Sequence, residues 1–117
     1  MNRVELLAPA GNFSKLKTAI YFGADAVYIG GKDFSLRALS DNFTDDEILS
    51  AVEYAHARNV KIYVTVNIFA KNSDFEKAEK YFRFLSRAKV DAVLITDIGL
   101  IDLCKEVAPD LPVHLST

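Results

Sequence analysis

The stretch KIYVTVN, residues 61–67, decides the fold class because its alternate side chains differ in kind. One alternate set is apolar and β-branched: Ile62, Val64 and Val66. The other set is polar or amphipathic: Tyr63, Thr65 and Asn67. Successive side chains of a strand point to opposite faces, so one face of this strand suits packing under helices and the other suits a partly polar interior.

Four further apolar runs have the length of strands: Val4–Ala8, Asp25–Ile29, Asp91–Thr96 and Pro112–Ser116. Between the runs, apolar residues recur at helical spacing, so the chain alternates strand and helix. The predicted helices begin at residues that can cap a helix: Asn12, Thr44, Ser73 and Asp97. The alternation predicts parallel strands joined by helical crossovers.

Strand–helix alternation is compatible with an open doubly wound sheet and with a (β/α)8 barrel. The parity of residues 61–67 also holds in the other strands, where one face is apolar and the other becomes polar toward the carboxyl end. A doubly wound sheet needs two apolar faces, and no Gly-x-Gly-x-x-Gly follows the first strand. The sequence therefore predicts an α/β fold that is part of a (β/α)8 barrel, with five parallel strands in chain order and four helices.

The fifth predicted strand, Pro112–Ser116, has no helix after it to cover its face. A complete (β/α)8 barrel with this spacing needs roughly twice the present length. We therefore interpret residues 1–117 as the N-terminal part of a barrel domain, truncated after the fifth strand. Unpaired edges on the two outer strands invite pairing with another chain, so we expect a homo-oligomer.

The composition excludes several classes of protein. The formal net charge of −2 gives no general electrostatic basis for nucleic-acid binding. Cys104 is the only cysteine, which excludes an intramolecular disulfide and a cysteine-rich metal site within this segment. No apolar run reaches membrane-spanning length, and the first residues lack a signal-peptide core, so we expect no membrane association and a cytoplasmic location.

Barrel enzymes place their active sites at the carboxyl ends of the strands. His114 is the sharpest catalytic candidate there, because a histidine of interior parity can act as acid, base or metal ligand. A hydrogen-bonded core histidine is the alternative role for this residue. Ser116 faces the same way two residues farther on, and Tyr28 also has interior parity, so both join the catalytic set. Interior packing with a hydrogen-bonded hydroxyl group is the alternative role for Tyr28. No spacing of residues indicates a metal site.

The same ends of the strands carry five candidate substrate-binding residues: Asn12, Arg37, Asn42, Thr65 and Asn67. Arg37 and Asn42 belong to a connection, residues 30–44, that is too long for an ordinary turn between a strand and a helix. Arg37 suits an anion, because a guanidinium can bind a carboxylate or phosphate through two hydrogen bonds. Helix capping is the alternative role for Asn12. Gly11, Gly30 and Gly31 are expected at turns that need a positive φ.

Several strings resemble a known family, and they occur in order along the whole chain. They are ELLAPAGN at 5–12, GADAVYIGG at 23–31, FSLRA at 34–38, YVTVN at 63–67 and HLST at 114–117. With these strings the chain resembles the opening of the U32 peptidase family, the collagenase-like proteases. The resemblance implies a parent several hundred residues long whose N-terminal part is a barrel-like catalytic domain.

The resemblance leaves three functions open. The family name implies proteolysis, so the main expectation is the N-terminal fragment of a peptidase, a hydrolase that is incomplete as an enzyme. Some relatives support oxygen-independent hydroxylation of tRNA or rRNA bases, or of a quinone precursor, which is the first alternative. An inactive folding unit is the second.

The resemblance also bears on cofactors and partners. The family's cysteine-containing signature, and the cysteines that hold an iron–sulfur cluster in some members, lie beyond Thr117. We therefore expect no cofactor in this segment and an iron–sulfur cluster, where the protein has one, in the C-terminal part. The intact protein is expected to act on a peptide or an RNA.

Overall fold

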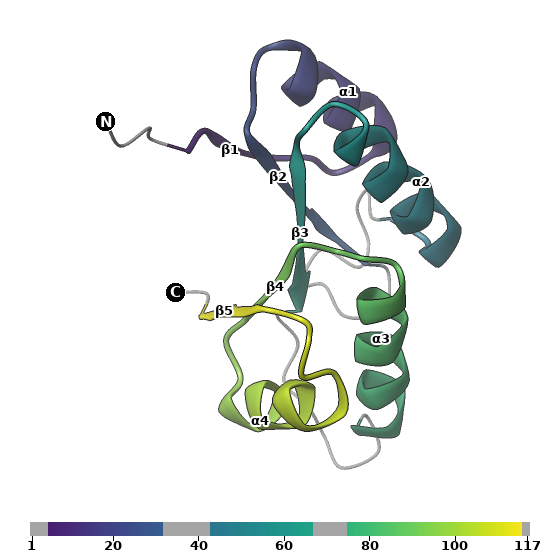
Figure 1. The fold of residues 1–117 in the computed structure, drawn as a ribbon, viewed down its shortest axis with the longest axis vertical. Coiled ribbons are helices and arrows are strands. Elements are labelled where there is room, and N and C mark those ends of the chain that lie inside the picture. The colour runs from purple at the N-terminus through teal and green to yellow at the C-terminus, as the bar shows by residue number, and fades with distance from the viewer. Residues whose placement is uncertain (1–4, 32–42, 67–74, 116–117) are drawn as a thin grey trace.

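The computed structural model describes residues 5–31, 43–66 and 75–115, in which strands and helices alternate (Figure 1). The elements are β1 (Leu7–Pro9), α1 (Phe13–Tyr21), β2 (Ala26–Gly30), α2 (Asp45–His56), β3 (Lys61–Val66), α3 (Phe75–Arg87), β4 (Ala92–Ile95), α4 (Ile98–Val107) and β5 (Val113–Leu115). All neighbouring strands pair in parallel, in the order β1-β2-β3-β4-β5. The predicted α/β fold, a partial (β/α)8 barrel of five parallel strands with four helices, is confirmed.

The predicted caps start three of the helices. The Asn12 side chain accepts a hydrogen bond from the Lys15 N–H at 2.9 Å, and Asp97 accepts one from Leu100 at 3.1 Å. Before α2, Thr44 and Glu47 form a reciprocal capping box with hydrogen bonds of 3.2 and 3.0 Å. These bonds satisfy N–H groups that have no partner inside the helix. The fourth predicted cap, Ser73, lies outside the described residues.

Three connections from a helix back to a strand share one backbone form. Each contains a residue of positive φ: Gly23 at 97°, Asn59 at 59° and Lys89 at 63°. The next residue donates its N–H to a carbonyl group five residues back: Ala24 to Ala19, Val60 to Ala55 and Val90 to Leu85. These are the bonds of a Schellman motif, which satisfies the last carbonyl groups of a helix. The motif therefore fixes where each helix ends.

The strings DAVYI at 25–29 and DAVLI at 91–95 are similar, and the aspartates that begin them have the same structural role. The Asp25 carboxylate accepts the N–H of Leu6 at 2.8 Å, and the Asp91 carboxylate accepts the N–H of Ile62 at 2.7 Å. In each case an aspartate just before one strand binds the backbone at the beginning of the neighbouring strand. The two aspartates therefore hold the amino ends of β1 and β3 in register.

The two faces of the sheet differ in the way that the strand parity predicts. All four helices lie on one side of the sheet, which we call the covered face; the other side is the open face (Figure 1). The strand residues in the main core, on the covered face, are 1% exposed or less: Val27, Ile29, Ile62, Val64, Val66, Val93 and Ile95. A smaller cluster occupies the open face: Ala26, Tyr63 and Ala92, with Tyr28 and Leu94 packed against it.

The outer strands of the sheet are less buried than the parity alone suggests. Leu6 and Leu115 have the parity of the covered face, yet they are 53% and 66% exposed. Each lies in or beside an edge strand, which pairs with one neighbouring strand among the described residues. This exposure is compatible with the expected self-association, which stays a prediction. No helix among the described residues is long and apolar enough to span a membrane.

Candidate functional site

The candidate site is the open face near the carboxyl ends of the strands. Of the residues predicted for it, the structure describes Asn12, Tyr28, Thr65 and His114. The other four lie outside the described residues: Arg37, Asn42, Asn67 and Ser116. Their predicted roles are therefore untested by the geometry.

The strand register places Thr65 and His114 in one row across the open face. Thr65 is paired with Leu94, and Leu94 is paired with His114. Two strand spacings separate Thr65 from His114, which is about 10 Å. Tyr28 lies in the next row toward the amino ends, beside Tyr63. Tyr28, Thr65 and His114 therefore belong to one surface rather than to scattered positions.

His114 is exposed on this face rather than buried in a core. Its ring meets the Tyr63 ring edge to face, with centroids 5.3 Å apart and an angle of 71° between the planes. Within the described part of the chain no hydrogen bond engages the imidazole. A ring held by an aromatic contact and open to solvent can exchange a proton with a bound molecule. Among the described residues His114 is therefore no hydrogen-bonded core residue, and its catalytic role stays a prediction.

Tyr63 is a member of this face that the sequence prediction did not select as a functional residue. It is only 7% exposed, and its hydroxyl donates a hydrogen bond to the Glu5 carboxylate at 3.2 Å. Burial, followed by the nearby charge of Glu5, raises the pKa of the Tyr63 phenol above its ordinary value of 10.0. The phenol therefore stays protonated at neutral pH and acts as a donor that fixes the ring against His114.

Asn12 and Thr65 already make hydrogen bonds within the fold. Asn12 caps α1, and the Thr65 hydroxyl donates to the carbonyl oxygen of Ile29 on the neighbouring strand at 3.3 Å. Both side chains are half-buried. A structural role is thus assigned to each by geometry, and their contact with a substrate stays a prediction.

The expectation that Gly11, Gly30 and Gly31 need a positive φ is wrong. Among the described glycines only Gly23 has a positive φ. Gly31 is required for a different reason, because a Cβ atom placed on it would overlap the hydroxyl group of Tyr81 on α3. Close packing against α3, rather than backbone conformation, explains a glycine at this carboxyl end of β2.

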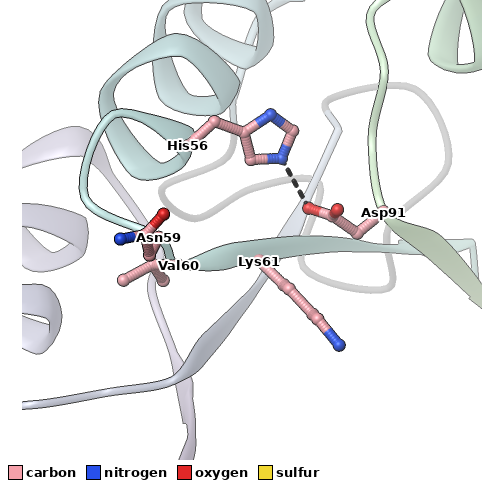
Figure 2. A pocket seen from close by; sticks show the side chains of 5 residues that line it. All are labelled: His56, Asn59, Val60, Lys61 and Asp91. Atoms are coloured by element: carbon pink, nitrogen blue, oxygen red, sulfur yellow. Dashed lines mark hydrogen bonds and ion pairs between the residues drawn. The ribbon is translucent and has the colours of Figure 1, made fainter.

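A pocket opens at the opposite edge of the sheet, at the amino ends of β3 and β4. It has a volume of about 320 Å³ and is lined by His56, Asn59, Val60, Lys61 and Asp91. Figure 2 shows the His56 ring directed at the Asp91 carboxylate, and the two side chains are 2.7 Å apart. The same carboxylate oxygen also accepts the N–H of Ile62. The amino-terminal edge of a barrel contributes to stability rather than catalysis, so we assign this pair a structural role.

The described residues do not fit an iron–sulfur cluster. Cys104 is fully buried on the inner side of α4, and burial raises the pKa of its thiol to about 11. A cluster needs several cysteines in the thiolate form. Within residues 5–31, 43–66 and 75–115, no group of three or more side chains could hold a metal ion.

Comparisons with known proteins find relatives whose similarity extends over almost the whole chain. A family model described as Peptidase family U32 matches residues 11–117. The tRNA hydroxylation protein P1 of Bacillus subtilis is 50% identical over 97% of this chain, and the 23S rRNA 5-hydroxycytidine C2501 synthase of Escherichia coli is 37% identical over 99%. The chain spans 27% and 17% of the lengths of these two relatives.

A solved structure of a U32 peptidase, Mk0906, has the same fold. It matches 99% of this chain with a TM-score of 0.77, and the chain covers 49% of that protein. The sequence identity is 14%, so this likeness concerns the fold alone.

The relatives correct the main functional expectation. The sequence led us to expect a peptidase fragment, and that expectation is wrong, because curated relatives with high identity are named for the hydroxylation of tRNA and rRNA. Those parts of the shared strings that the structure describes lie in strands, caps and turns, so they identify the fold of the family and leave its chemistry open. The first alternative, base hydroxylation, is the function that these findings favour.

Proposed function

This chain belongs to peptidase family U32, and from that premise we propose that the protein it forms part of hydroxylates bases of tRNA without using dioxygen. The observation that carries the proposal is the 50% identity to the tRNA hydroxylation protein P1 over 97% of the chain. This alignment extends over 113 residues, so it includes strands and helices on both sides of the sheet. A tRNA substrate also agrees with the expected cytoplasmic location.

The open face is where we propose that the base binds. Enzymes that modify a base remove it from its stack and hold it between aromatic or apolar side chains. Tyr28 and Leu94 offer such side chains, and both are half-buried on the open face. His114 is exposed beside them, within ring contact of Tyr63, and can donate or accept a proton. The segment therefore contributes a wall of the base pocket and a residue for proton transfer.

Hydroxylation replaces a hydrogen atom on the base by a hydroxyl group and oxidises the base by two electrons. Without dioxygen, the reaction needs either a hydroxylated co-substrate that gives up its oxygen and is reduced by these two electrons, or water together with a two-electron acceptor. An iron–sulfur cluster can supply electron transfer when it is bound. We propose that cysteines outside residues 1–117 hold it, because the described residues offer only the buried Cys104. The role of this chain's own residues is to bind and orient the base and, through His114, to transfer a proton.

Deletion of the gene for the intact protein tests the proposal. Mass spectrometry of digested wild-type tRNA should show a hydroxylated nucleoside that is one oxygen atom heavier than its unhydroxylated form. We expect tRNA from the deletion strain to lack this nucleoside. The wild-type gene should restore it, in aerobic and in anaerobic culture. A His114→Ala gene should not, although the variant protein accumulates to the wild-type level. Unchanged tRNA nucleosides in the deletion strain would overturn the proposal.

A second candidate is hydroxylation of an rRNA base. It is favoured by the 37% identity to the 23S rRNA 5-hydroxycytidine C2501 synthase. The same deletion strain separates the two candidates, because tRNA and rRNA can be purified and digested separately. Loss of a hydroxylated nucleoside from rRNA alone would favour the second candidate.

A further inference from the structure

The outer surface of α1 and α2 carries an alternation of aromatic and basic side chains. On α1, Phe13, Lys17 and Tyr21 follow one another at four-residue spacing, so they form a single stripe along the helix. Tyr54 and Arg58 have the same spacing on α2 and in the turn that follows it. We call these five residues the α1–α2 seam. The two helices lie side by side on the covered side of the sheet (Figure 1).

The geometry of the seam fixes both cations against rings. The Lys17 ammonium lies 5.3 Å from the centre of the Phe13 ring and 5.6 Å from that of Tyr54. The Arg58 guanidinium lies 3.7 Å from the Tyr54 ring centre and donates a hydrogen bond to the Tyr54 carbonyl oxygen at 3.0 Å. Phe13 and Tyr54 meet edge to face at 5.7 Å. One aromatic pair therefore presents two positive charges on the surface.

The charge of this surface is not neutralised within the described part of the chain. None of the ion pairs found there includes Lys17 or Arg58. Helix α1, with the sequence FSKLKTAIY, contains no acidic residue. Helix α2 carries Asp45, Asp46 and Glu47 in its first turn and Glu53 next to Tyr54, so the positive charge of the seam is confined to Lys17 and Arg58. Such a patch attracts a polyanion at close range.

Two exposed rings lie at the end of the seam. Tyr21 and Phe22 are 84% and 75% exposed, and their rings meet edge to face at 5.2 Å. The cation–π contacts between α1 and α2 explain why Phe13 and Tyr54 occupy half-buried positions. They do not explain why the large rings of Tyr21 and Phe22 are exposed to solvent. Exposed aromatic rings beside unpaired cations are the combination with which proteins bind unstacked bases and the phosphates that join them. A purely apolar partner would leave both cations without compensation.

We infer that the α1–α2 seam, extended by Phe22, binds RNA outside the base pocket. Lys17 and Arg58 contact phosphates, and an unpaired base stacks on one ring of the perpendicular Tyr21–Phe22 pair. Phe13 directly follows Asn12 at the carboxyl end of β1, so the seam runs from the edge of the open face along α1. The nine residues of α1 span about 13 Å, enough for a few nucleotides. The identity of this RNA as tRNA rests on the proposed function.

Binding of a fluorescently labelled, unmodified tRNA transcript to the intact protein tests the inference, with anisotropy measured at several salt concentrations. Replacing both rings (Tyr21→Ser with Phe22→Ser) should weaken binding roughly 5- to 150-fold, the loss expected for one stacked base. Replacing both cations (Lys17→Gln with Arg58→Gln) should weaken binding and reduce the slope of log affinity against log salt by about 2.

A matched control removes an exposed apolar side chain and a lysine from α4. Ile98 is 75% exposed and Lys105 is also exposed, so Ile98→Ser with Lys105→Gln changes the same properties on another helix. This variant should bind the transcript as the wild type does. Thermal melts of all variants should agree, which would exclude a general loss of folding as the cause.

Wild-type affinity and salt slope in both seam variants would overturn the inference. So would seam variants that bind tRNA normally but sediment in a different assembly state, because the surface would then be a protein interface. Binding is measured without hydroxylation, so it reports on the seam whatever the reaction is. The proposed function fails separately, if tRNA nucleosides are unchanged in the deletion strain.

Discussion

The two faces of the sheet are built from the same five strands but have opposite surroundings. On the covered face, Val27, Ile62 and Val93 are fully buried under helices. On the open face, Tyr28 and Leu94 are half-buried and His114 is exposed. Burying a Val or Ile side chain contributes about 1.5–3 kcal/mol, so the covered face supplies most of the folding free energy of the segment. The open face is less constrained by folding, and its side chains are available for binding and chemistry.

This contrast is testable because it predicts a ranking of free energies of unfolding. Substitutions under the helices should destabilise most, substitutions at the ends of the strands less, and substitutions on the open face least. Each expected loss is a decrease in the free energy of unfolding of the 117-residue chain, measured by urea unfolding at a single protein concentration. The fixed concentration matters because self-association would add to the apparent stability.

The largest loss is expected for Phe82→Ala on α3. Phe82 is fully buried among the helices and the covered face, so its removal leaves a cavity that should cost about 3–5 kcal/mol. Phe84→Ala, on the same helix, is the matched control. Phe84 is half-buried and stacks on Tyr81, so its loss should be clearly smaller. Equal losses for the two variants would contradict the ranking by burial.

A smaller loss is expected for Gly31→Ala at the carboxyl end of β2. The new methyl group would overlap the Tyr81 hydroxyl, and overpacking of this kind costs about 1–3 kcal/mol. A double-mutant cycle with Tyr81→Phe sharpens the test, because removing the hydroxyl should recover part of the loss. Strictly additive effects of the two substitutions would show that their contact is not the cause.

The fold could be predicted from the sequence because side-chain parity and helix signals are local. The strand predicted from the stretch at residues 61–67 is found at Lys61–Val66, and the caps at Asn12, Thr44 and Asp97 form as expected. Several predicted strand boundaries were wrong, and at two of them a side chain binds the backbone where a strand was expected. Strands were predicted from Val4 and Asp91, but β1 begins at Leu7 and β4 at Ala92.

At the start of β1 the N–H of Leu6 is bound by the Asp25 side chain rather than by a neighbouring strand. Asp91 likewise uses its side chain to bind the backbone of β3 before its own strand begins. In both cases an aspartate side chain takes the place of a backbone hydrogen bond between strands. The hydrophobicity of the neighbouring residues does not reveal such a bond, so it could not predict where the strand begins.

The candidate site could be predicted only in part. Parity correctly placed Tyr28, Thr65 and His114 on one face, because period-two alternation is a property of each strand alone. The Tyr63–Glu5 hydrogen bond joins residues 58 positions apart, and the His56–Asp91 pair joins residues 35 positions apart. Such contacts depend on how distant segments pack, so spacing in the sequence could not reveal them.

An intermediate loss is expected for Asp91→Ala at the amino ends of the strands. The substitution leaves the partly buried Ile62 N–H without its acceptor and removes the partner of His56, which should cost about 1–3 kcal/mol. His56→Ala keeps the bond to Ile62 and should cost less. Asp102→Ala, at an exposed position of α4, is a control expected within about 0.5 kcal/mol of the wild type.

The smallest loss is expected on the open face, for Tyr63→Phe. The substitution removes one hydrogen bond to the partly exposed Glu5, without creating a cavity, and should cost about 1 kcal/mol at neutral pH. Its pH dependence identifies the cause. Because the pKa of Tyr63 is raised in the folded state, its contribution is fully present below pH 10.0, the ordinary pKa. Above that pH the unfolded chain loses the proton while the folded chain keeps it, so the wild type should lose stability faster than Tyr63→Phe. A difference between the two proteins that is unchanged as the pH rises past 10.0 would show that the Tyr63 phenol does not stabilise the open face through its proton.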